Sequence, residues 1–124
     1  MARVLVADDD PAILDICTEV LALDGLDVDV ACYGLQARDR SLSERYDALL
    51  LDVQMPGMSG TDVCLEVKGR PDTCDTPVIV MSAAGSYISA QVKQCGADAY
   101  LPKPFDIDVL LSVVGDLTGG YSQA

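Results

Sequence analysis

The stretch LLLDVQMPGMSG, residues 49–60, decides the fold of this chain. Three leucines precede Asp52, and an uninterrupted apolar run of this kind is typical of a strand that is covered on both faces. Asp52 is therefore expected at the carboxyl end of a strand, and the MPGMSG segment predicts the turn that follows. Open α/β sheets place their binding sites at that edge.

A second acidic group follows another apolar run, near the start of the chain. Asp8 and Asp9 come directly after that run in the stretch VLVADDDP, residues 4–11. Two strand ends would bring these carboxylates and Asp52 to one pocket, where they repel one another. A hard divalent cation such as Mg2+ relieves that repulsion, so the residues predict a magnesium site.

Apolar runs alternate with helical stripes along the whole chain. This alternation predicts an α/β fold, a doubly wound (βα)5 unit whose five-stranded parallel sheet carries helices on both faces. The expected strands cover residues 3–7, 27–31, a run ending at 52, 78–81 and 99–101.

Capping residues and apolar stripes locate the helices. Asp10, Ser59 and Asp106 are the expected N-caps, and Gly96 is expected to end a helix over residues 87–95. A helix over residues 35–42 is highly charged and has a narrow apolar face. The positions expected to face the core are, after Ser59, Val63, Leu65 and Val67 and, in the last helix, Ile107, Leu110, Leu111 and Val114.

Composition limits the classes of function. The 124 residues suit one domain, and the net charge of −12 argues against nucleic acid or an anionic membrane as a direct partner. The five cysteines are scattered, and there is no histidine. We therefore expect reduced thiols and a cytoplasmic location. No signal peptide and no run of membrane-spanning length are expected.

Four motifs in order, each at an expected strand end, resemble the receiver domain of bacterial two-component response regulators (CheY-like). They are VLVADDDP (4–11), LLLDVQMPGMSG (49–60), VIVMSA (78–83) and AYLPKPF (99–105). The resemblance covers nearly the whole chain and implies the flavodoxin-like strand order 2-1-3-4-5. We expect the receiver domain over residues 1–118 and a frayed tail over 119–124.

The resemblance also implies a chemistry. Asp52 would be the phosphoacceptor, and Mg2+ would be held by Asp9, by Asp8 partly through water, by Asp52 and by the carbonyl oxygen of Gln54. Lys103 would pair with the phosphoryl group, and its bond to Pro104 is expected to be cis. The Asp52 and Lys103 side chains are expected at a solvent-accessible edge.

Four positions are implied in switching and timing. Ser82 would move to hydrogen-bond the phosphoryl group, and Tyr100 would then turn inward. Gln54 and Ala84 would tune the lifetime of the phosphoryl group. Taken singly, Lys103, Ser82 and Tyr100 are ordinary surface, turn and strand residues.

The function predicted is a signalling switch that catalyses only its own phosphorylation and autodephosphorylation. The partners implied are a histidine kinase or histidine phosphotransfer protein and a protein effector, with a monomer or a weak dimer through the face of helix 4, strand 5 and helix 5. The alternative is a small Mg2+-dependent phosphatase of the haloacid dehalogenase type, but its second acid would be at position 54, which is glutamine. A flavodoxin-like binding module is a third possibility, although this chain lacks the loop that would cradle a phosphate in such a module.

Overall fold

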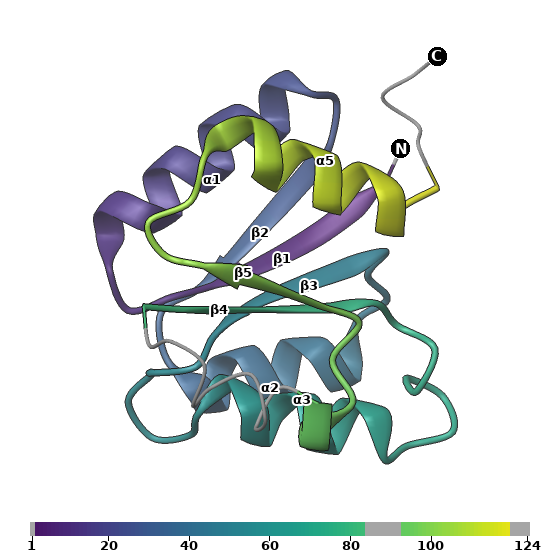
Figure 1. Cartoon of the computed structure of the whole chain (residues 1–124). Coiled ribbons are helices and arrows are strands. Elements are labelled where there is room, and N and C mark those ends of the chain that lie inside the picture. Colours follow the sequence, from purple (N-terminus) through teal and green to yellow (C-terminus); the bar gives the residue numbers. More distant parts are fainter. Residues whose placement is uncertain (1, 84–92, 120–124) are drawn as a thin grey trace.

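The computed structural model describes residues 2–83 and 93–119 (Figure 1). Most of the helix expected over residues 87–95, the lifetime-tuning candidate Ala84 and most of the expected tail lie outside the described residues. The elements, in chain order, are β1 (Arg3–Ala7), α1 (Pro11–Leu23), β2 (Asp27–Ala31), α2 (Gly34–Ser43), β3 (Ala48–Asp52), α3 (Gly60–Lys68), β4 (Val78–Ser82), β5 (Ala99–Pro102) and α5 (Ile107–Leu117).

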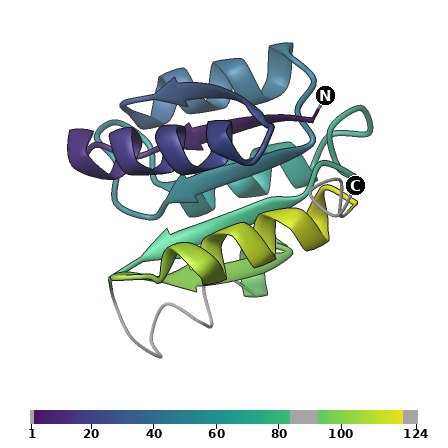
Figure 2. The same cartoon turned by 90° about the horizontal axis from the view of Figure 1, so that it is seen from above.

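The sheet has the predicted order. Its five strands are all parallel and run β2-β1-β3-β4-β5, so β3 lies at the centre. Helices α1 and α5 cover one face, and α2 and α3 cover the other (Figures 1 and 2). Every residue of β3 and β4 is buried, as the apolar runs predicted. The parallel pairing of β1 with β3 places the carboxyl ends of these two strands side by side, in register from Val4 opposite Ala48.

Two of the three predicted N-cap residues form a side-chain capping hydrogen bond. The Asp10 side chain accepts a hydrogen bond from Ala12 N at 3.0 Å, and Ser59 accepts one from Asp62 N at 3.2 Å. Asp106 is the N-cap residue of α5, but its side chain makes no capping bond. Gly96 has a φ of 84°, which is the left-handed conformation predicted for a helix terminator.

Two core positions were predicted wrongly. Leu65 is 52% exposed, because the 3.6-residue period of α3 turns Val63, Cys64 and Val67 inward and leaves the position between them in solvent. Ile107 is 45% exposed at the first turn of α5. In α5 the buried positions begin one turn later, at Leu110.

Helix α2 packs through small residues. Gly34, Ala37 and Ser41 are buried, and the charged residues of this helix are partly or fully exposed. Arg38 pairs with Glu66 of α3, and Arg40 lies 3.4 Å from Asp29. None of the described helices is long and apolar enough to cross a membrane.

Lys68 forms hydrogen bonds that join several segments at the amino edge of the sheet. Its Nζ donates to the carbonyl oxygen of Thr76 at 2.8 Å and to Asp98 Oδ2 at 2.8 Å. The same Asp98 oxygen accepts from Val78 N at 2.8 Å, at the start of β4. One ammonium thus joins the end of α3, the loop before β4 and the residue before β5.

We expect Lys68→Met to lower the free energy of unfolding by about 2 kcal/mol, because charge-assisted hydrogen bonds are lost from a half-buried site. Urea denaturation measures this change. Arg70→Met is the matched control, since it removes the same charge from an exposed position just beyond α3. Equal destabilisation by the two variants would contradict the role given to Lys68.

Candidate functional site

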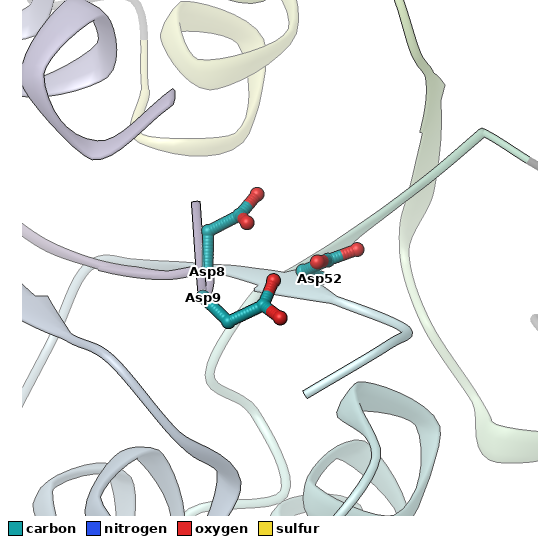
Figure 3. Close-up of side chains that lie close together, drawn as sticks. All are labelled: Asp8, Asp9 and Asp52. Carbon is teal, nitrogen blue, oxygen red and sulfur yellow. The ribbon is translucent and has the colours of Figure 1, made fainter. Parts of the chain in front are cut away.

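Three carboxylates gather at the carboxyl edge of the sheet. Asp8 and Asp9 follow β1, Asp52 ends β3, and one oxygen from each lies within 4.8 Å of the others (Figure 3). Asp9 is exposed, whereas Asp8 is fully buried and Asp52 is only 6% exposed. The sequence correctly predicted that these residues meet, but the expectation of an accessible edge is wrong for the Asp52 side chain.

Lys103 brings a positive charge to the two buried carboxylates. Its Nζ lies 2.5 Å from Asp8 Oδ2 and 3.5 Å from Asp52 Oδ2. The Lys103-Pro104 peptide bond is cis, as expected. Pairing with Asp8 was not predicted, because the sequence says only that Lys103 follows a strand and not where a long flexible side chain ends.

Burial and charge set the protonation of the site. Burial first and the charge of Asp8 second raise the pKa of Asp52 from 3.8 to about 6, and Lys103 opposes this only in part. Burial lowers the pKa of Lys103, but the hydrogen bond to Asp8 and the charge of Asp52 outweigh it and raise the pKa above its ordinary value. The ammonium is therefore charged at neutral pH, and Asp52 ionises readily only above about pH 6.

The remaining predicted site residues surround this centre. Ser82 is buried at the end of β4, and its carbonyl oxygen accepts from Lys103 N at 2.8 Å and from the Tyr100 hydroxyl at 3.4 Å. Tyr100 is half-buried and packs against the core on the α2 and α3 side of the sheet. Gln54 is exposed, and its backbone N–H lies 3.4 Å from Asp52 Oδ1.

The arrangement suits a hard cation and an anion bound together. Carboxylate oxygens are the ligands that Mg2+ prefers, and the exposed Asp9 offers an entry to the buried pair. No His belongs to the chain. The hollow of about 580 Å3 lined by Tyr46, Asp47 and Thr76 lies at the opposite, amino edge of the sheet, so the chemistry does not belong there.

Residue Gln54 also separates two classes of function. A phosphatase of the type considered above needs an acid two residues after its nucleophile to protonate the leaving group. The amide of Gln54 cannot donate a proton in that way, and its side chain is exposed.

Comparison with known proteins agrees with this geometry. Residues 4–115 match the family described as the response regulator receiver domain. Response regulator MprA from Mycobacterium tuberculosis is 42% identical over 112 residues, which are 89% of this chain and 47% of that protein. The chain therefore spans about half the length of the curated relatives it matches.

Solved structures agree as well. The response regulator TrrA from Thermotoga maritima, in complex with Mg2+-BeF, is 35% identical with a TM-score of 0.85, covering 94% of this chain and 99% of that one. A receiver domain of a sensor histidine kinase from Pseudomonas aeruginosa has a magnesium ion coordinated in its active site cleft. It is 26% identical with a TM-score of 0.88, covering 95% of this chain and 98% of that one.

None of these relatives favours the phosphatase alternative. The family match extends from β1 into α5 and includes both acidic strand ends and Lys103. The chain belongs to the receiver domain family of response regulators.

Proposed function

We propose that this receiver domain accepts a phosphoryl group on Asp52 and thereby switches a protein-binding surface. The observation that carries the proposal is the meeting of Asp8, Asp9 and Asp52 beside the Lys103 ammonium. An Asp52 oxygen would attack the phosphorus of the donor, and the donor's bond to phosphorus would break with its electron pair leaving on the donor. The product is an aspartyl phosphate.

The residues present fit Mg2+. Asp9 and Asp52 would bind it directly, Asp8 partly through water, and the carbonyl oxygen of Gln54 would complete the protein ligands. When bound, the cation offsets negative charge on the carboxylates and on the incoming phosphoryl group. The finding that supports this assignment is the crowding of three carboxylates of which two are buried.

Lys103, Ser82 and Tyr100 would convert the new charge into a conformational change. Lys103 contacts both buried carboxylates, so it can leave Asp8 for a phosphoryl group on Asp52 with a short movement. Ser82 would supply a hydroxyl to the same group, and Tyr100 would follow it. The bond from the Tyr100 hydroxyl to the Ser82 carbonyl already joins these two residues. Gln54 and Ala84 would set the rate of hydrolysis.

The phosphoryl donor would be a histidine kinase or a histidine phosphotransfer protein, and the effector would be another protein. Phosphorylation and autodephosphorylation would be the only reactions catalysed. The proposed domain covers residues 1–118, with 119–124 as a tail, and it acts in the cytoplasm as a monomer or a weak dimer through the face of helix 4, strand 5 and helix 5. With −12 net charge it would bind no nucleic acid directly.

Acetyl phosphate with Mg2+ should add one labile phosphoryl group to Asp52, and mass spectrometry should locate it. Asp52→Asn should abolish the adduct because the amide is a poor nucleophile. Asp15→Asn, at an exposed position of α1, should leave it unchanged. An adduct of normal stoichiometry on the Asp52→Asn protein would overturn the assignment.

Mg2+ should raise the melting temperature, because only the folded chain brings the three carboxylates together. The stabilisation should follow RT ln(1 + [Mg2+]/Kd), about 2.7 kcal/mol at one hundred times Kd. Asp9→Ala should remove the shift while leaving the buried pair in place. A wild-type melting temperature that stays constant at saturating Mg2+ would refute the metal site.

Without metal, Asp52→Asn should stabilise the protein in a pH-dependent way. Because folding raises the pKa of Asp52 to about 6, ionisation costs stability as pH rises from about 4 to above 6. The gain should be less than about 1 kcal/mol near pH 4 and about 2 to 3 kcal/mol above pH 7. Urea denaturation in EDTA measures it. A gain that is independent of pH would show that ionisation of Asp52 is not its cause.

A further inference from the structure

The amino end of α2 contacts the loop that follows Asp52 through the backbone. Helix α2 begins at Gly34, and its N-cap residue Tyr33 provides no side-chain hydrogen bond. The first amide of the helix donates instead to the carbonyl oxygen of Pro56 at 3.0 Å. A loop carbonyl from another part of the chain thus satisfies a helix-end donor that would otherwise lack a partner.

The two backbones approach closely at this point. A methyl group on Gly34 would lie 1.9 Å from the carbonyl oxygen of Met58 and 2.6 Å from Met58 Cβ. Since one overlapping atom belongs to the backbone, no rotation of a side chain relieves the clash. Only glycine fits here while the loop keeps its position.

The contact with Gly34 adds a backbone hydrogen bond at the centre of the loop, where Met55 also packs into the core. The two ends of the loop are held to the sheet and to each other, by Val53 N to Met81 O at 2.9 Å and Gly60 N to Val53 O at 3.1 Å. Within the described parts of the chain, the backbone hydrogen bond from Gly34 is the one that reaches residues 55–58 from outside the loop. Gln54 lies between the fixed end and this centre, directly after Asp52.

We propose that Gly34 is a positioning residue for cation binding, because it fixes the loop that carries the Gln54 carbonyl oxygen. The inference rests on the proposed function of Gln54 as a ligand. Gly34 has no side chain that could bind a cation, and its contacts are with Pro56 and Met58. It acts through the loop, and groups that orient metal ligands in this way typically change metal affinity by about 10-fold to 100-fold.

The test compares Gly34→Ala with Ala37→Gly. Both changes are in α2, but Ala37→Gly loosens the buried helix without adding atoms beside Met58. We expect Gly34→Ala to raise the Mg2+ concentration for half-maximal phosphorylation by acetyl phosphate at least about tenfold. Ala37→Gly should leave that Mg2+ concentration within about twofold of the wild-type value. This should hold even if Ala37→Gly lowers the melting temperature as much as Gly34→Ala does. Equal Mg2+ requirements in the two folded variants would overturn the inference.

A measurement on the wild-type chain covers the case in which Gly34→Ala does not fold. In a Mg2+ titration followed by 15N NMR, the amides of Gly34 and Gln54 should shift with the same Kd, and the amide of Ser41 at the far end of α2 should stay fixed. A Gly34 amide that stays fixed while that of Gln54 moves would refute the coupling. A wild-type chain that binds Mg2+ with this pattern but takes up no phosphoryl group would refute the proposed function alone.

Discussion

Repulsion between the buried carboxylates of Asp8 and Asp52 is the constraint on which the rest of the site depends. The register of β1 and β3 brings the two strand ends together, and the burial of both side chains leaves little water to screen them. An uncompensated buried charge costs about 3 to 5 kcal/mol. Lys103 offsets part of this cost because its ammonium contacts one carboxylate oxygen of Asp8 and one of Asp52. The compensation is incomplete, since the pKa of Asp52 stays raised to about 6. A further positive charge would therefore stabilise the ionised carboxylates of the site.

The contacts of Lys103 extend from the carboxylates to the neighbouring strands. The Lys103 side chain contacts both buried carboxylates, and its backbone N–H donates to the Ser82 carbonyl oxygen. The Tyr100 hydroxyl is bonded to the same carbonyl oxygen. One connected set of contacts therefore links the end of β3 to the ends of β4 and β5. A phosphoryl group, which adds charge beside Asp52, would bias this set toward a second arrangement.

The sequence predicted the sheet and the meeting of the acids because both follow from local patterns. Apolar runs define strands, and parallel strands must place their carboxyl ends at one edge. The pairing of Lys103 with Asp8 could not be predicted, since it depends on where a flexible stem comes to rest. Leu65 was misplaced because it is two residues from Val63 and so lies about 200° around the helix from it, on the solvent side. The close approach of Gly34 to Met58 involves two backbones far apart in sequence, and no pattern in a single chain reports that distance.

The opposite edge of the sheet has stabilising contacts that do not involve the carboxylates. There Lys68 and Asp98 form hydrogen bonds that join α3, β4 and the start of β5, and they involve none of the predicted site residues. These hydrogen bonds stabilise the fold and can offset part of the cost of the buried carboxylate pair. Ser82 and Tyr100, the residues proposed to switch, belong to β4 and β5. The hydrogen bonds of Lys68 and Asp98 lie at the amino ends of these two strands.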